Sequence, residues 1–249
     1  REPHLGRNIA AAVHSPGDHQ VENRDVLRAL VVAAERAGVR LHSHTPVEAL
    51  ETAGGRATGL RIAGTVHNAD AVVLAAGAWS GGLAGVPPEA RPPVRPLKGQ
   101  MLALQMDPAA PILTHTIWAP TTYLIPRLDG RLLIGATVEE RGFDETITAG
   151  GLLALLDTAW RALPTIEELP VVEQWVGFRP TSRDDAPIFG PTSTDGLFLA
   201  TGHHRNGILL APLTADAVSL AVLGQDMPEI ARPFTLDRFA PKAKTKAVA

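Results

Sequence analysis

The chain has 249 residues, 45% of them hydrophobic and 20% charged, a composition typical of a globular protein rather than a disordered one. Because 23 Lys and Arg face 26 Asp and Glu, the net charge of −3 disfavours a nucleic-acid-binding protein, which would carry a basic surface. Cysteine is absent, which excludes disulfides, thiolate metal ligands and a cysteine nucleophile, and no apolar run approaches the ~20 residues that span a membrane.

The first third of the chain predicts one helix followed by a β-meander. Residues 1–21 show no sustained periodicity and are expected to be extended or looped. Apolar residues at helical spacing predict a helix from the N-cap Asn23 to Gly38, with a short strand over 39–42 after it. Alternating residues between 46 and 76, punctuated by Gly54-Gly55, predict a meander.

The run 71–76 differs from the meander because it is continuously small or aliphatic. Such a run predicts a strand that is buried on both faces. A proline-rich stretch over 87–96 then indicates a crossing between two subdomains.

The remainder predicts an antiparallel sheet and two more helices. The dipeptide Asp129-Gly130 is the strongest hairpin signal in the chain. Strands are expected over 101–106, 112–118, 123–127, 131–138, 171–178 and 196–201, and helices over 151–163 and 209–223. Residues 241–249 are expected to be disordered. The fold class that follows is mixed α+β.

Common catalytic motifs do not occur in the sequence. It contains no Gly-x-Gly-x-x-Gly turn, no Walker A sequence, no Gly-x-Ser-x-Gly elbow and no His-Glu-x-x-His helix. His42 and His44 are expected to face opposite sides of a strand, so they do not suggest a shared metal ion. We therefore predict no metal site.

The segment 202–212 is the best candidate for chemistry because it lies between a predicted buried strand and a predicted helix. A strand-to-helix junction directs backbone N–H groups and the positive end of the helix dipole at a ligand. Gly202 and Gly207 would permit close approach of a planar or anionic group. Arg205 between them either binds such a ligand or pairs within the loop, and the spacing does not separate these alternatives.

Two further residues could bind a small carboxylate. Arg179 ends an apolar strand and is followed by Pro180, which favours a rigid guanidinium fork that suits a carboxylate. The alternative is a salt bridge to Asp184 or Asp185. Tyr123, the one tyrosine of the chain, is either a residue at the edge of the core or, if it converges with Arg179, the second part of a carboxylate clamp.

Five segments together resemble the FAD-dependent D-amino acid oxidase family, and most closely the glycine oxidases of thiamine biosynthesis. The resemblance extends from about residue 2 to residue 239. The block Gly-His-x-Arg-Asn-Gly-Ile-Leu-Leu-Ala-Pro is specific to this group, whereas Ala-Ala-Gly-Ala-Trp-Ser is shared more widely among flavin oxidases. The segments are 45–47, 71–80, 123–127 with 135–137, 177–181 and 202–212.

The resemblance implies an incomplete FAD-binding Rossmann-like subdomain interleaved with a substrate subdomain built on an antiparallel sheet. Residues 1–95 would form mostly the remainder of the FAD-binding subdomain, with part of the substrate subdomain near the N-terminus. Residues 96–178 would form the substrate subdomain, and residues 179–240 would return to the FAD-binding subdomain.

The resemblance also implies roles for individual residues. Arg179, Arg205 and Tyr123 would bind the substrate, and Val47 would meet the adenine side of FAD through its backbone. The remaining cofactor contacts would come from Gly77 and from the loop residues His203, His204, Arg205, Asn206, Gly207, Ile208 and Leu209. In this family a hydride passes from the substrate Cα to the flavin, oxygen reoxidises the flavin to give hydrogen peroxide, and the imine hydrolyses to a keto acid and ammonia. A cytoplasmic homo-oligomer would follow by analogy.

One departure from the family is large. The family begins with a Gly-rich βαβ unit that binds the FAD pyrophosphate, and no such unit occurs here. We expect the chain to be a fragment or one subunit of a split enzyme, to need a separate N-terminal FAD-binding segment or subunit, and to retain FAD weakly alone. Two alternatives stay open: an amino-acid dehydrogenase that passes electrons to a carrier, and a non-catalytic remnant that binds carboxylates or assists assembly.

Overall fold

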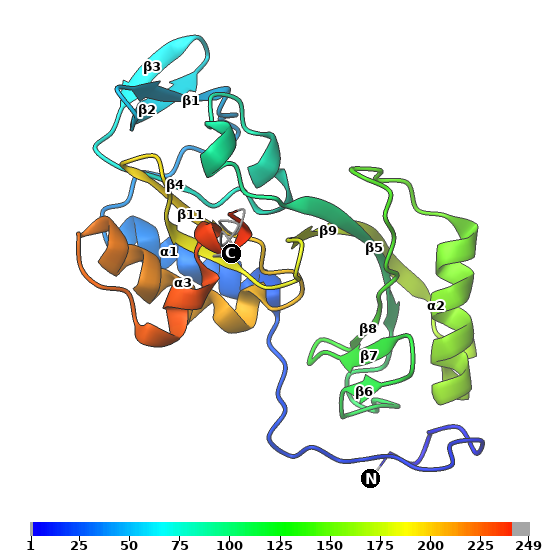
Figure 1. Cartoon of the computed structure of the whole chain (residues 1–249). Helices are drawn as coiled ribbons and strands as arrows, with labels where there is room; N and C mark the ends of the chain where they lie inside the picture. Colours follow the sequence, from blue (N-terminus) through cyan, green and yellow to red (C-terminus); the bar gives the residue numbers. More distant parts are fainter. Residues whose placement is uncertain (1, 241–249) are drawn as a thin grey trace, which may run out of the picture. The chain divides into compact units, whose positions relative to one another are not determined.

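The computed structural model of the protein describes residues 2–240, and the tail expected to be disordered lies outside the described residues. The chain divides into two compact units, and both are discontinuous in sequence (Figure 1). The first comprises Arg1–Leu41 and Leu97–Phe178, and the second comprises His42–Pro96 and Arg179–Ala249. The mixed α+β class with antiparallel sheets is confirmed.

The first unit is built on a five-stranded sheet with strand order β6-β7-β8-β5-β9. Strands β6, β7, β8 and β5 pair antiparallel with their neighbours, so the predicted sheet and its Asp129-Gly130 hairpin are confirmed. The strands are β5 (Arg95–Gln105), β6 (Ile117–Trp118), β7 (Tyr123–Pro126), β8 (Arg131–Gly135) and β9 (Val171–Thr181).

Helix α2 (Ala149–Ala162) covers one face of this sheet (Figure 1). Its N-cap Thr148 accepts a hydrogen bond from the backbone N–H of Gly151 at 3.1 Å. The helix buries Leu155, Ala159 and Ala162, which lie on one face at helical spacing. These residues pack with Leu102, Leu104, Leu124, Leu132 and Ile134 of the sheet to form the core of the unit.

Helix α1 (Asn23–Arg36) also belongs to the first unit, and its N-cap is Glu22 rather than the predicted Asn23. Gly38 lies just beyond the C-cap with a φ of 83°, as expected for a helix-terminating glycine. The predicted strand over 39–42 is wrong. These residues form no strand, and 51% of Val39 is exposed, because among the described residues no neighbouring strand pairs with them.

The second unit contains the predicted meander as a three-stranded antiparallel sheet, β1 (Ala49–Ala53), β2 (Arg56–Ile62) and β3 (Thr65–Asn68). The Gly54-Gly55 turn is confirmed, with φ of 58° and 81° at the two residues. Both values lie in the left-handed region, where only glycine is unstrained.

A second sheet of this unit has the order β10-β11-β4, formed by Ile188–Pro191, Leu197–Thr201 and Val72–Leu74. Strand β11 pairs parallel with β4 and antiparallel with β10. Helix α3 (Gly207–Val222) contacts β10 and β11. The prediction that residues 71–76 are buried on both faces is wrong, because 43% of Val73 is exposed in the described part of the unit.

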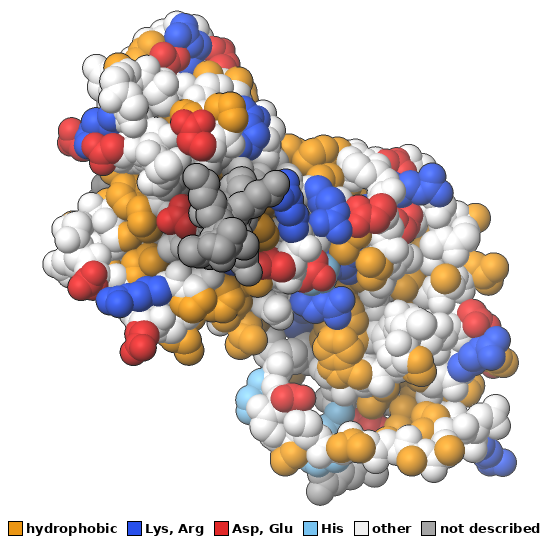
Figure 2. All heavy atoms as spheres, in the orientation of Figure 1, with side chains coloured by type: hydrophobic (Ala, Val, Ile, Leu, Met, Phe, Trp, Pro, Cys, Tyr) orange, Lys and Arg blue, Asp and Glu red, His pale blue; other side chains and the backbone are white. Residues whose placement is uncertain are grey.

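Short 3-10 helices complete the two units: η1 (Gly77–Gly82), η2 (Pro88–Ala90), η3 (Pro164–Glu168), η4 (Glu229–Phe234) and η5 (Leu236–Phe239). On the face drawn in Figure 2, acidic and basic side chains are interspersed rather than gathered by sign. Within residues 2–240, no helix has the length and apolar character needed to cross a bilayer.

Candidate active site

The end of β9 and the loop that precedes α3 are hydrogen-bonded to each other. Thr181 forms an isolated antiparallel bridge with His203. The backbone N–H of His204 donates to the carbonyl of Pro180 at 2.8 Å, and Thr181 Oγ1 lies 3.0 Å from His204 Nδ1. Arg179 therefore lies in the same unit as the 203–205 loop, two residues before the bridge. The structure brings these two predicted segments together.

This junction is rich in guanidinium groups. Burial lowers the pKa of His204; Asp185 opposes this shift, and the positive charges of Arg205, Arg179 and Arg95 lower the pKa further. His204 is consequently neutral at pH 7, and the surrounding arginines favour an anion. No sequence pattern indicates Arg95, whose guanidinium donates to the carbonyl of Ser182 at 3.1 Å. Arg95 lies in the proline-rich stretch over 87–96, and only the tertiary fold places it at this junction.

Asp184, one of the two alternative partners predicted for Arg179, pairs with another arginine. The carboxylate of Asp184 accepts two hydrogen bonds from Arg238, at 2.9 and 3.0 Å. These bonds outweigh the effect of burial and lower the pKa of Asp184 to about 2. Asp184 thus stabilises the C-terminal part of the second unit.

The two loop histidines have different surroundings. His203 Nε2 lies 2.9 Å from Thr214 Oγ1, and its ring stacks on Phe189 with centroids 6.3 Å apart. Burial lowers the pKa of His203. Because its side chain is committed to helix α3 and the core, a cofactor contact by His203 would have to use its backbone, and that contact stays a prediction.

The first turn of α3 is accessible. Asn206 occupies the N-cap position without capping the helix by its side chain, and Ile208 and Leu209 are 49% and 79% exposed. A Cβ added to Gly207 would meet only His203 Cβ, at 3.5 Å, so the fold leaves room there. The free amides and the positive end of a 16-residue helix make this turn suitable for an anionic or electron-rich group.

Gly77 lies beside the start of the same loop. Thr201 Oγ1 donates to the carbonyl of Gly77 at 3.0 Å, and Ser80 Oγ donates to Thr201 Oγ1 at 2.9 Å, with both hydroxyls buried. Gly77 has a φ of 53° and open space where a Cβ would stand. Val47 lies in the segment before β1 and is 38% exposed, and its role toward adenine stays a prediction.

Tyr123 begins β7 in the first unit, where it is partly exposed and pairs with Gly135 of β8. Its hydroxyl donates to Met101 Sδ at 3.7 Å, and its ring lies 5.4 Å from that of Trp118. No sequence pattern marks Met101, because nothing local distinguishes it from other strand residues. Since Tyr123 and Arg179 belong to different units, their convergence stays a prediction.

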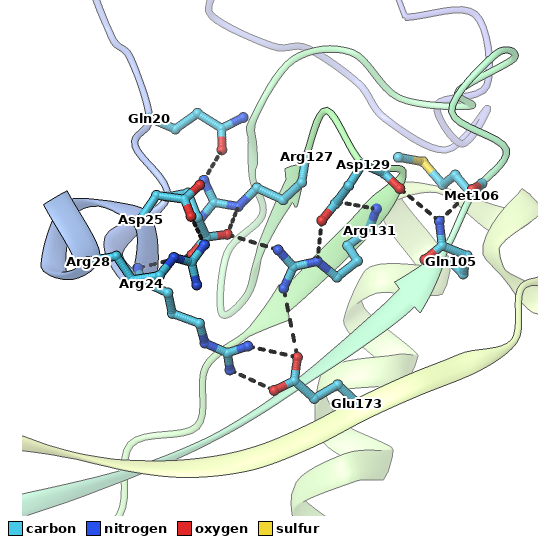
Figure 3. A network of polar contacts seen from close by, with 11 residues as sticks. Gln20, Arg24, Asp25, Arg28, Gln105, Met106, Arg127, Asp129, Arg131 and Glu173 are labelled. Carbon is cyan, nitrogen blue, oxygen red and sulfur yellow. Dashed lines mark hydrogen bonds and ion pairs between the residues drawn. The ribbon is translucent and has the colours of Figure 1, made fainter.

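Arg127, which ends the Tyr123 segment, belongs to an ion-pair network within the first unit (Figure 3). Its guanidinium donates to Gln20 Oε1 at 2.7 Å and lies 3.3 Å from Glu22. Burial lowers the pKa of Arg127, and Glu22 opposes that shift. Arg24 of α1 pairs with Glu173 at 2.6 Å.

The network connects the first turn of α1 to the β7–β8 hairpin and to β9 (Figure 3). The Arg24 guanidinium also lies over the ring of Trp175, 5.2 Å from its centroid. Arg127 therefore has a structural role. Across the described residues, no group of three His, Asp or Glu side chains could hold a metal ion.

Comparisons with known proteins agree with this arrangement. Residues 1–220 match the family described as FAD dependent oxidoreductase (DAO). The glycine oxidase of Pseudomonas aeruginosa is 39% identical over 87% of this chain and 60% of its own length. The bifunctional protein ThiO/ThiG of Trichormus variabilis is 37% identical over 98% of this chain and 37% of its own length.

A solved structure gives the same result for the fold. The crystal structure of glycine oxidase from Geobacillus kaustophilus superposes with a TM-score of 0.86 at 37% identity, over 96% of this chain and 64% of the other. The chain thus spans between about a third and two thirds of the length of these relatives. Since the family match covers most of the sequence, this chain belongs to the FAD-dependent oxidoreductase family.

Proposed function

We propose that this chain supplies the carboxylate-binding residues and the flavin-facing loop of an enzyme that oxidatively deaminates glycine or another small amino acid or amine. One observation carries the proposal: the Arg179 end of β9 is hydrogen-bonded to the 203–205 loop, which gathers Arg179, Arg205 and Arg95 around a neutral His204. The relatives named glycine oxidase support the substrate class.

The residues at the start of α3 fit the cofactor of the family. A Cβ at Gly77 would meet nothing within 4 Å and one at Gly207 only His203 Cβ, so both positions would leave room for a planar ring, and the first turn of α3 would offer it backbone donors. When FAD is bound, its ring system accepts the hydride equivalent from the substrate Cα and passes the electrons to oxygen. The side chains of the chain therefore orient the substrate rather than perform acid–base chemistry.

Each proposed substrate residue has a role that its chemistry suits. Arg179 would hold the carboxylate through two parallel N–H donors, a charge-assisted interaction of about 1.5–3 kcal/mol. Arg205 would help to close the same pocket, and Tyr123 would hydrogen-bond to the substrate. With His204 neutral, the positive charge available for the carboxylate stays on the arginines.

The proposal also concerns which small substrates the site accepts. Thr121 and Val138 would flank the substrate, and both side chains are exposed. Glycine, sarcosine and small D-amino acids are the proposed candidates, because one methylene changes discrimination by only about 1–3 kcal/mol. The ThiO/ThiG name of one group of relatives supports a place for the product in thiamine biosynthesis.

Oxygen consumption by the FAD-loaded full-length protein tests the proposal. We expect glycine, sarcosine or a small D-amino acid to drive oxygen uptake with stoichiometric hydrogen peroxide and, from the primary amines, ammonia. Reduction of an artificial dye without any oxygen uptake would instead favour the dehydrogenase alternative. Failure of every small amino acid in both assays would overturn the proposed activity.

A further inference from the structure

Met101 lies at a crowded point beside the tyrosine proposed to bind substrate. Strand register places Met101 opposite Gly135 of β8, and Gly135 in turn pairs with Tyr123 of β7. The Tyr123 hydroxyl donates to Met101 Sδ at 3.7 Å. A thioether is a weak hydrogen-bond acceptor.

The three residues leave no spare volume on the side of Gly135. A Cβ built on Gly135 would stand 2.7 Å from Met101 Cε and 2.8 Å from Tyr123 Oη, closer than real Cβ contacts allow. The Met101 methyl group and the Tyr123 hydroxyl therefore pack against the same backbone position. A chemical change at the Met101 sulfur would therefore affect the Tyr123 hydroxyl that donates to it.

Met101 is also accessible to a small oxidant. The chain has no cysteine and three methionines, so the thioethers are its oxidisable sulfurs. Met106 is 2% exposed within the core of the first unit, whereas Met101 and Met227 are partly exposed. Met227 belongs to the second unit, where it packs beside Gly190.

We propose that Met101 is a peroxide-sensitive modification site whose oxidation to the sulfoxide binds the Tyr123 hydroxyl more strongly and weakens substrate binding. The inference rests on the proposed function, which supplies both the oxidant and the role of Tyr123. In the reaction the sulfur lone pair attacks one peroxide oxygen and the O–O bond breaks. The leaving hydroxide takes the remaining peroxide proton, so thioether and H₂O₂ become sulfoxide and water, with sulfur oxidised by two electrons.

The sulfoxide would alter the hydrogen bond of the Tyr123 hydroxyl. Its oxygen is a much stronger acceptor than the thioether sulfur, so it retains the hydroxyl that would otherwise bond to substrate. This change acts on substrate binding, so the enzyme would be slowed by its own accumulated product.

The test treats the FAD-loaded full-length protein with graded hydrogen peroxide and measures methionine oxidation by peptide mass spectrometry alongside steady-state kinetics. We expect Met101 to be oxidised while Met106 stays intact, with a several-fold rise in KM that follows Met101 occupancy and a smaller change in kcat. Methionine sulfoxide reductases should restore the original KM.

Two variants identify the residue responsible. Met101→Leu keeps a similar volume without sulfur, so its KM should not respond to peroxide, whereas Met227→Leu should respond as the unaltered protein does. An unmodified Met101 under conditions that oxidise Met227, or an oxidised Met101 with unchanged KM, would overturn the inference. If the untreated protein oxidises no small amino acid, the proposed function fails, and selective oxidation of Met101 is then judged from the mass spectra alone.

Discussion

At the scale of single residues, two glycines in the candidate loop have different roles. Gly202 has a φ of 74°, and a Cβ there would meet Ile188 at 3.2 Å, so the fold itself requires glycine. Gly207 begins α3 with room for a side chain. The structure therefore gives no internal reason for glycine at 207, which agrees with the close approach of a ligand.

The series Gly207→Ala and Gly207→Val tests that approach. We expect unchanged or slightly higher thermal stability, because glycine is about 0.5–1 kcal/mol worse than alanine within a helix. FAD affinity should fall progressively from glycine to alanine to valine, as measured by titration of flavin fluorescence in the full-length protein. Gly202→Ala is the contrasting control and should lower the melting temperature. Full FAD affinity in Gly207→Val would contradict a close cofactor contact.

Arg179 is the second test at this scale. In the full-length protein, Arg179→Ala should raise KM and lower kcat/KM by several orders of magnitude while FAD stays bound. Arg179→Lys should restore only part of the loss, because an ammonium cannot reproduce a two-point fork. Kinetics and the flavin spectrum measure the two effects separately. Unchanged kinetics in Arg179→Ala would assign Arg179 a structural role.

At the scale of elements, local signals predicted the parts of the fold that local physics determines. Helix α2 and the β7–β8 hairpin agree with expectation to within a few residues because a capping threonine and an Asp-Gly turn specify them. Strand β10 was missed, since it is only four residues long and contains Gly190 and Pro191. The segment 39–42 has strand composition but lacks a neighbouring strand among the described residues.

The candidate site shows the same division between local and tertiary information. Side-chain chemistry alone suggested Arg179 and Arg205, but their juxtaposition depends on the bridge between Thr181 and His203. Arg95 and Met101 could not be found from the sequence, because each acquires its neighbours only through long-range pairing.

Helix α2 allows a direct test of which face supports the sheet. Leu155 is 2% exposed and belongs to the core, whereas Leu153 is 69% exposed on the same helix. Leu155→Ala should reduce the free energy of unfolding by about 2–5 kcal/mol, as truncation of a buried leucine does. Leu153→Ala should change it by less than ~0.5 kcal/mol. Urea denaturation measures both values, and equal losses would contradict the packing of α2.

At the scale of the whole molecule, the sequence passes between the units at residues 41–42, 96–97 and 178–179. Each unit is thus held together by contacts between segments that are far apart in sequence. In the second unit, Asp184 and Arg238 form such a contact over 54 residues, between the segment before β10 and η5. Contacts of this kind depend on ionisation state.

Low pH should weaken the contact between Asp184 and Arg238 and so lower the stability of the second unit. The pKa of Asp184 is lowered from 3.8 to about 2, so its contribution to stability is present above pH 3.8 and is lost as the pH falls through about 2. Asp184→Asn should unfold more readily at pH 7 and show a shallower loss of stability between these pH values. Asp185→Asn, at the exposed neighbouring residue, is the control. Identical acid unfolding curves for Asp184→Asn and the unaltered protein would contradict this role.

The contact between Arg24 and Trp175 has a practical consequence for following the molecule in solution. The guanidinium of Arg24 lies over the indole of Trp175, so the fluorescence of Trp175, one of four tryptophans in the chain, should report whether α1 remains attached at its first turn. Attachment could then be followed without an added label, by recording tryptophan fluorescence while the ionic strength is raised.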